Sequence, residues 1–216
     1  MNKAFPELSE ALSQLLDQMD ASIRKGGYDG APITMYLAGG MAVNFYCGTR
    51  YTEDVDAFYT QRVHVGRCEV SYRHKDGSPS FLYLDNNYNP TFGLLHENHD
   101  RDAVEWTGIG NERRKIHLYV LSPVDLAVTK ISRYSPQDRE DILSLASAGL
   151  FSADQLRDRS IEALSDHIGD RAPVMTSIEL ICRQISAGKS PQFGREPEFP
   201  FDPPNKTKGK DRELEI

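Results

Sequence analysis

The sequence contains few of the features that mark secreted, membrane-bound or zinc-binding proteins. Its three cysteines, Cys47, Cys68 and Cys182, form no Cys-x-x-Cys pair, so neither a zinc site nor a disulfide framework is expected. No apolar run is long enough to cross a bilayer, and the mean hydropathy is −0.52. The first residues show no secretory-signal pattern. We therefore expect a cytoplasmic chain with reduced thiols and no membrane attachment.

Positively charged residues are fewer than negatively charged ones. The chain has 25 Lys and Arg against 32 Asp and Glu, which gives a net charge of −7. Broad electrostatic attachment to nucleic acid is therefore disfavoured, although a small basic patch could hold a nucleotide or the end of a tRNA. The absence of a basic stripe weakens the interpretation as an RNA-binding adaptor. The length of 216 residues fits one core with a helical extension.

The pattern of apolar residues divides the first part of the chain into helices and strands. Leu, Ile and Met recur every three or four residues from Leu8 to Ile23, which predicts a helix with one apolar face. The short apolar run 33–38 stands between Pro32 and Gly39, which predicts a buried strand. The other expected elements are a short helix over 41–46, a strand over 53–59, a hairpin of 67–74 with 80–84, and a strand pair of 104–109 with 115–121.

From Ser122 onward the sequence is typical of helices. Ser122 suits the N-cap, Pro123 the first helical position and Asp125 the third. Four helices are expected, over 123–133, 136–148, 152–165 and 170–186. The tail from Gly188 is rich in Pro, Lys and Glu and is expected to be flexible. We expect three lysines of this tail to aid solubility: Lys206, Lys208 and Lys210.

One constellation points to chemistry. Gly39 and Gly40 stand where the expected strand meets a helix, and there backbone N–H groups can approach a phosphate with no side chain in the way. Thr52 precedes Asp54 and Asp56, whose i, i+2 spacing places both carboxylates on one face of a strand. Two carboxylates so placed can share Mg²⁺. The metal would bridge nucleotide phosphates and stabilise in-line displacement of pyrophosphate.

Gly39-Gly40 followed by Asp54-Val55-Asp56 resembles the signature of the polymerase-β-type nucleotidyltransferases: Gly-Gly or Gly-Ser, a spacer, then Asp-x-Asp. The resemblance is closest to bacterial nucleotidyltransferase-like proteins. It extends more distantly to the AbiE-type toxins of abortive-infection and toxin–antitoxin systems. It covers residues 33–148, and only the combination of motifs is specific.

The resemblance implies further site residues on the later helices. Lys130 matches the family's lysine, and Asp138 with Asp141 match its Arg-Asp-x-x-Asp-like motif. Lys130 would neutralise the triphosphate as a point charge. Asp138 or Asp141 would orient that lysine or act as base on the incoming hydroxyl. Arg133 and Arg139 are candidates for phosphate contacts.

Many members of the superfamily carry a third metal carboxylate on a later strand, and here the nominee is Glu105. Without a third acid, either one metal suffices or catalysis has been lost. The implied fold class is α+β, with a mixed β-sheet flanked by helices. Residues 1–121 would form the nucleotidyltransferase-like core, 122–187 a helical region packed on it, and 188–216 the flexible tail.

Simpler interpretations stay open beside these roles. They are a tight turn without ligand for Gly39 and Gly40, a solvated strand face for Asp54 and Asp56, an exposed helix lysine for Lys130, and surface ion pairs with Arg133 or Arg139 for Asp138 and Asp141. His96 and His99 are three residues apart without a third ligand at a recognisable distance, which favours structural roles. Four aromatic residues could stack on a base but more often pack in a sheet: Tyr83, Tyr88, Phe92 and Trp106.

Two hypotheses follow. The first is a Mg²⁺-dependent enzyme that transfers a nucleoside monophosphate from an NTP such as ATP to an RNA end, tRNA included, or to a protein hydroxyl. The resemblance inclines this hypothesis toward a toxin–antitoxin or phage-defence system with a cognate toxin or antitoxin partner. The second is a catalytically silent protein of the same fold that binds nucleotide or a partner as a sensor or antitoxin.

Overall fold

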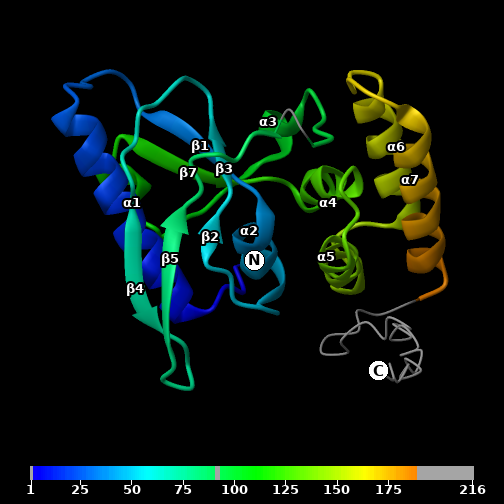
Figure 1. Cartoon of the computed structure of the whole chain (residues 1–216), viewed down its shortest axis with the longest axis horizontal. Coiled ribbons are helices and arrows are strands. Elements are labelled where there is room, and N and C mark those ends of the chain that lie inside the picture. The colour runs from blue at the N-terminus through cyan, green and yellow to red at the C-terminus, as the bar shows by residue number, and fades with distance from the viewer. Residues whose placement is uncertain (1, 91–92, 189–216) are drawn as a thin grey trace, which may run out of the picture.

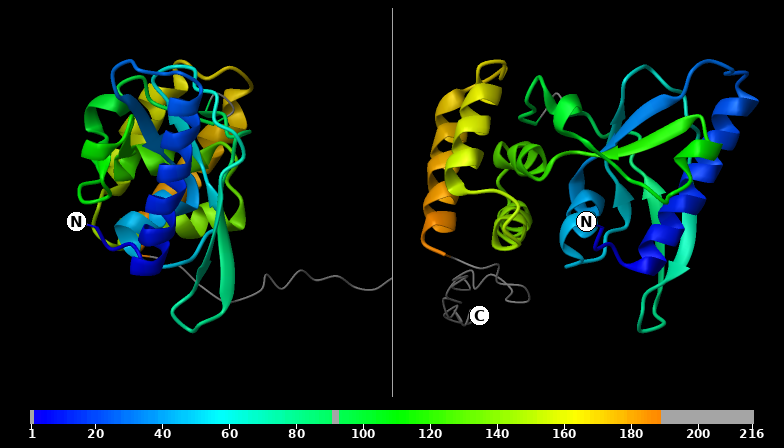
Figure 2. Two further views of the ribbon diagram at one scale, coloured as in Figure 1. Left: turned by 90° about the vertical axis from the view of Figure 1, so that its left-hand side faces the viewer. Right: turned by 180° about the vertical axis from the view of Figure 1, so that it is seen from behind.

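The computed structural model describes residues 2–90 and 93–188. Two small β-sheets lie on one side of the molecule and the helices α4 to α7 on the other, with α2 between them (Figure 1). The view from behind shows the same division (Figure 2). The tail expected to be flexible lies outside the described residues from 189 onward, together with its three lysines, and so does Phe92.

The first sheet has the order β3-β1-β7-β6. Its central strands β1 (Ile33–Leu37) and β7 (Ile116–Val120) are parallel, with Leu37 opposite Val120. The outer strands β3 (Ala57–Tyr59) and β6 (Val104–Glu105) each run antiparallel to their neighbours.

The second sheet has the order β2-β5-β4. β4 (Glu69–Arg73) and β5 (Pro79–Leu84) form the expected hairpin, and β2 (Asp54–Val55) runs parallel to β5. The exposed residues of this hairpin alternate with buried ones, as in a sheet with one face in the core.

Helix α1 (Pro6–Lys25) contacts both sheets. Its buried face is the one expected from the spacing of the apolar residues: Leu8, Ala11, Leu12, Leu15, Leu16, Met19 and Ile23. Helix α2 (Gly39–Cys47) is buried from Gly40 to Tyr46. It lies between the sheets and the helices α4 and α5, which it contacts.

The four helices expected after residue 122 have nearly the expected bounds: α4 (Pro123–Ile131), α5 (Pro136–Ser147), α6 (Ala153–Leu164) and α7 (Arg171–Ser186). The short helix α3 (His99–Asp102) and a 3₁₀ turn at Asn111–Arg113 were not expected. Ser122, Ser135 and Ser152 cap α4, α5 and α6 through their side-chain oxygens. The caps fix where each helix begins. The α+β fold class and the helical C-terminal region are thereby confirmed.

Two expected strands are shorter than predicted. The strand over 53–59 is divided, because Asp54 and Val55 pair with β5 whereas Ala57 to Tyr59 pair with β1. The strand over 104–109 ends at Glu105, and Trp106 packs into the core at 4.6 Å from the ring of Phe45. Among the described helices, none combines the length and the apolar character that a bilayer crossing requires.

Candidate active site

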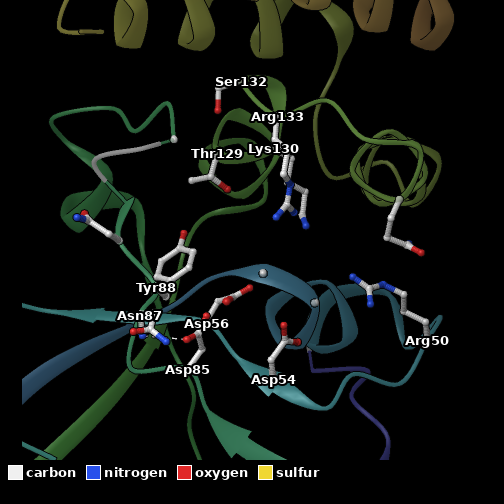
Figure 3. A pocket seen from close by; sticks show the side chains of 15 residues that line it. Arg50, Asp54, Asp56, Asp85, Asn87, Tyr88, Thr129, Lys130, Ser132 and Arg133 are labelled. Atoms are coloured by element: carbon white, nitrogen blue, oxygen red, sulfur yellow. Dashed lines mark hydrogen bonds between the residues drawn. The ribbon is translucent and has the colours of Figure 1, made fainter. Parts of the chain in front are cut away.

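A cleft of about 530 Å³ separates the ends of the sheets from helix α4. Carboxylates lie on its sheet side, and the side chains of Lys130 and Arg133 lie opposite them (Figure 3). The lining residues are Gly39, Gly40, Arg50, Asp54, Asp56, Asp85, Asn87, Tyr88, Asn89, Gly93, Thr129, Lys130, Ser132, Arg133 and Gln137. The cleft therefore holds most of the residues that the sequence nominates.

The Gly39-Gly40 turn forms one wall of the cleft. Gly39 has φ +57°, and a Cβ there would lie 1.8 Å from Oδ2 of Asp56. A Cβ on Gly40 would lie 2.8 Å from Oγ1 of Thr52 and 2.9 Å from Nη2 of Arg50. Glycine is therefore favoured at both positions, since a side chain would displace Asp56 at Gly39 and would crowd Thr52 and Arg50 at Gly40. Helix α2 begins at this turn. The first N–H groups of a helix have no partner within the helix, so the N-terminus of a helix attracts anions.

Gly39→Ala is expected to destabilise the fold by about 1–3 kcal/mol from backbone strain and to weaken nucleotide binding in the presence of Mg²⁺ by displacing Asp56. Gly77 is the matched control: its φ is +85°, but a Cβ there meets nothing within 4 Å. Gly77→Ala should therefore cost strain alone and leave nucleotide binding unchanged. Chemical denaturation and titration with a fluorescent NTP analogue measure the two effects. Equal nucleotide affinity in both variants would contradict the role given to Gly39.

Asp54 and Asp56 both line the cleft, although they do not belong to one continuous strand. Asp54 lies on β2, where its Oδ1 accepts a hydrogen bond of 2.5 Å from Oγ1 of Thr52. Asp56 lies between β2, which pairs with β5, and β3, which pairs with β1, and its carbonyl accepts a hydrogen bond from the amide of Ala38 at 2.8 Å. The divergence of the two sheets thus places Asp56 against the glycine turn.

The carboxyl group of Asp56 has a pKa raised to about 6. Burial is the main cause, and the negative charges of Asp54 and Asp85 add to it. Lys130 and Arg133 oppose the shift from across the cleft. The sheet side of the cleft therefore carries more negative charge than its own surroundings neutralise, which favours a bound cation.

The opposite wall is a network of cations held by buried aspartates. Nζ of Lys130 lies 2.8 Å from Asp141 and 3.7 Å from Asp138. Asp138 also accepts two hydrogen bonds from Arg133, at 2.6 and 2.7 Å. Both aspartates are buried, and neither lines the cleft. This geometry fits the orienting role that the sequence offered for Asp138 and Asp141.

The chain matches a protein family over residues 12–172, and the family is described as a nucleotidyltransferase of unknown function (DUF6036). It belongs to this family. The similarity to nucleotidyltransferases is thereby confirmed, whereas the more distant similarity to AbiE-type toxins stays a prediction from sequence. Neither the curated proteins nor the solved structures contain a match to the chain.

In this member of the DUF6036 family, Asp85 rather than Glu105 lines the cleft as a third carboxylate. Asp85 directly follows β5, beside β2, and lines the cleft with Asp54 and Asp56. Glu105 lies on the exposed strand β6, where it accepts a hydrogen bond from Asn111. Asp85 could have been identified from its position at the end of β5, the strand that pairs with the strand of Asp54. That pairing was missing from the sequence analysis.

Arg50 is a second residue that the sequence analysis missed. Its guanidinium makes a bidentate ion pair with Asp141, at 3.0 and 2.9 Å, and it lines the cleft beside Gly40. Arg50 thereby joins the loop after α2 to α5. Its partner is 91 residues away in the sequence, so no local motif could have identified it.

Most of the other nominated residues lie outside the cleft. Arg139 is near Glu140, at 3.8 Å. His96 is buried and bonds to Glu162 of α6, and His99 packs against Tyr36 and Phe58, so both have structural surroundings. Tyr88 does line the cleft, whereas Trp106 belongs to the core.

The described residues contain no group of three or more His, Cys, Asp or Glu side chains arranged to hold a metal ion. A cation at Asp54 and Asp56 would need its remaining ligands from water or from nucleotide phosphates. Mg²⁺ fits such a site because it prefers oxygen ligands and usually keeps several waters beside one or two carboxylates and substrate phosphates.

Proposed function

We propose that this protein transfers a nucleoside monophosphate from an NTP to a hydroxyl group with the help of Mg²⁺. One observation carries the proposal: the carboxylates of Asp54, Asp56 and Asp85 face Lys130 and Arg133 across one cleft, next to a glycine turn at a helix N-terminus (Figure 3). A triphosphate fits between these walls because it needs donors and cations along its length and a metal site at its reactive phosphorus.

Each wall has a distinct task in binding the nucleotide. The free amides of the Gly39-Gly40 turn donate to phosphate oxygens. Lys130 and Arg133 supply positive charge, and their buried aspartate partners keep both side chains in fixed positions. Arg50 extends this positive wall toward Gly40. Asp54 and Asp56 would hold Mg²⁺, which when bound would neutralise negative charge on the phosphates.

The reaction exchanges one bond to phosphorus for another. The acceptor oxygen forms a bond to the α-phosphorus while the bond from that phosphorus to the bridging oxygen breaks, and pyrophosphate leaves with the electron pair. The hydroxyl proton passes to a carboxylate of the cleft. Asp85 is the group we assign to this step, because it also lines the neighbouring hollow from which an acceptor can approach.

The affinity for Mg²⁺ is expected to fall as the pH drops below about 6, because Asp56 must lose its proton before it can bind the cation and its pKa is raised to about 6. Above that pH the affinity should be nearly constant. Calorimetric titration with Mg²⁺ between pH 5 and 8 checks this. Asp56→Asn should remove the step near pH 6, and a wild-type profile without a step there would contradict the assignment.

A catalytically silent nucleotide-binding protein is the second candidate. Two observations favour it: the described residues hold no ready set of three metal ligands, and Lys130 and Arg133 are already paired with Asp138 and Asp141. Such a protein would bind an NTP without releasing pyrophosphate. We also propose, from the resemblance alone, a toxin–antitoxin or phage-defence setting with a cognate partner protein.

The experiment is to follow label from each α-labelled NTP, with Mg²⁺, onto total tRNA and onto the proteins of a lysate. Wild type is compared with Asp54→Asn/Asp56→Asn and with Asp158→Asn, which makes the same chemical change at an exposed position of α6. Transfer that is lost only in the double variant supports the enzyme. Binding of NTP without any transfer favours the silent protein.

A further inference from the structure

A second hollow of about 560 Å³ opens beside the cleft. Residues 57–63 line one side of it, and Asp85, Asn86 and Tyr88 line the other. Asp85 and Tyr88 line the cleft as well, so the two hollows meet at these two residues. We call the second hollow the β3 groove. Its position suits the acceptor, because a ligand there reaches the reaction centre without displacing the nucleotide.

The wall of the β3 groove is the free edge of a β-sheet. β3 is the last strand of its sheet, and β1 is its neighbour. The amide of Thr60 donates to Thr34, and the carbonyl of Asp56 accepts from Ala38. Backbone groups alternate in direction along an antiparallel strand, so the N–H and C=O groups of Ala57 and Tyr59 face the groove. Within residues 2–90 and 93–188, these groups have no hydrogen-bond partner.

A free edge with alternate unpaired groups is complementary to the main chain of an extended peptide, which can add as a further strand. A peptide added in this way would lie about 4.8 Å from β3, the usual distance between neighbouring strands. Ala57 directly follows Asp56, and Asp85 lines both the groove and the cleft. A Ser, Thr or Tyr side chain of a peptide paired at Ala57 can therefore reach the carboxylates.

The charge of the groove favours a peptide over RNA. Its lining residues include one cation, Arg62, and one anion, Asp85. RNA would need several phosphates neutralised along such a groove, and the chain as a whole carries a net charge of −7. A peptide main chain is neutral and needs only the donors and acceptors that Ala57 and Tyr59 offer.

We propose that the acceptor of the transfer is a protein, and that an extended segment of it binds to the edge of β3 and brings a side-chain hydroxyl to Asp85. This inference rests on the proposed function. It predicts tolerance of many peptide sequences, since main-chain hydrogen bonds supply the affinity, with selection mainly for an extended segment around the hydroxyl.

The exposed pair Phe81 and Tyr83 offers a rival acceptor site. The two rings lie 6.2 Å apart on β5, and Tyr83 is opposite Asp54 in the register of the sheet. Exposed aromatic rings can stack on the bases of single-stranded RNA. RNA as the acceptor is therefore the alternative outcome, and Phe81→Ala is the variant that would affect it.

The test uses the full-length protein and an array of extended eight-residue peptides with Ser, Thr or Tyr at the centre. Bound protein and label transferred from α-labelled NTPs are read on the same array, and total tRNA is treated in parallel. The inference expects peptide binding and label on peptides. Label on tRNA alone would overturn the peptide acceptor and uphold the transferase. Binding to peptides without label on peptides or tRNA would uphold the groove as a peptide-binding site and overturn the transferase. If peptides are neither bound nor labelled, the groove is overturned as a peptide-binding site.

Asn86→Trp is the variant that fills the groove, because Asn86 is exposed and lines the groove but not the cleft. It should reduce peptide binding and labelling about tenfold or more by preventing the main-chain hydrogen bonds, with NTP affinity unchanged. Thr176→Trp, which adds the same side chain at an exposed position of α7, should behave as wild type. Equal losses in both variants, or none in either, would contradict the inference.

Amide hydrogen exchange gives a readout that needs no activity. In the free protein, the amides of Ala57 and Tyr59 should exchange quickly, whereas those of Phe58 and Thr60, which bond to β1, should be protected. A bound peptide from the array should slow exchange at Ala57 and Tyr59. Protection of both amides in the free protein would mean that a second copy or another segment of the chain occupies the edge, and it would overturn the inference.

Discussion

The Asp56→Asn variant is expected to lose nucleotide transfer by more than about a thousandfold, because it removes a charged oxygen ligand at the place where phosphate charge is stabilised. Asparagine keeps the size of the side chain, so the close contact with Gly39 is preserved. Release of pyrophosphate from NTP in the presence of Mg²⁺ measures the loss. NTP affinity without Mg²⁺ should change little.

The same variant should be more stable than wild type. The pKa of Asp56 is raised in the folded protein, to about 6 from an ordinary value of 3.8, so its ionised form costs folding free energy above pH 6. That cost disappears as the pH falls through 6 toward 4, because the folded state binds the proton first. At pH 7.5 without Mg²⁺, Asp56→Asn should raise the free energy of unfolding by about 1–3 kcal/mol.

The two effects together separate function from structure. A variant that loses transfer only because it unfolds would show a lower free energy of unfolding. Asp54→Asn is a useful comparison, because Asp54 lines the same cleft. Loss of transfer with increased stability supports Asp56 as a functional group held in place at a cost in stability. Full transfer by Asp56→Asn would show that the cleft is not the reaction centre.

Local patterns were sufficient to predict most of the fold. The apolar spacing of α1, the turn signals of the β4–β5 hairpin and the serine caps of α4 to α6 act within a few residues, and each element was found near its expected place. The division of the strand over 53–59 was not predictable in this way. It depends on two different partners, β5 and β1, and pairing between strands is a long-range property.

The candidate site shows the same limit. Gly39, Gly40, Asp54 and Asp56 form a compact motif and were nominated from sequence, and the structure brings them together. Lys130 was nominated from the family resemblance and lies opposite. Asp85 and Arg50 join the cleft only through strand pairing and through an ion pair across 91 residues.

Ion pairs in the walls of the cleft join the core to the helical region. Arg50 from the loop after α2 reaches Asp141 of α5, and Lys130 of α4 reaches the same carboxylate. The cationic wall therefore depends on the packing of α4 and α5 against α2. Buried ion pairs of this kind contribute little net stability but fix positions, which is what phosphate recognition requires.

Asp141→Ala is expected to lower the free energy of unfolding by about 3–5 kcal/mol, the range for removal of one partner from a buried ion pair. Asp141 is 1% exposed and accepts hydrogen bonds from Arg50, Lys130 and Gln137. Burial raises the pKa of its carboxyl group, but the hydrogen bond from Arg50 and the charge of Lys130 outweigh it and hold the pKa below its usual value. Its removal leaves Lys130 buried and less well paired. Urea unfolding monitored by circular dichroism measures the loss.

Lys130→Met is the matched variant and should cost less than half as much. Methionine has a similar length, and each aspartate keeps an arginine, since Asp141 retains Arg50 and Asp138 retains Arg133. If Lys130 itself contacts the triphosphate, Lys130→Met should lower NTP affinity more than Asp141→Ala does, because Asp141→Ala leaves the ammonium group in the protein. At a pH low enough to protonate Asp141, the wild type should lose its stability advantage over Asp141→Ala. Equal destabilisation by both variants at neutral pH would contradict this expectation. It would show that loss of the ion pair itself, rather than a buried lysine left without its partner, determines the stability of this wall.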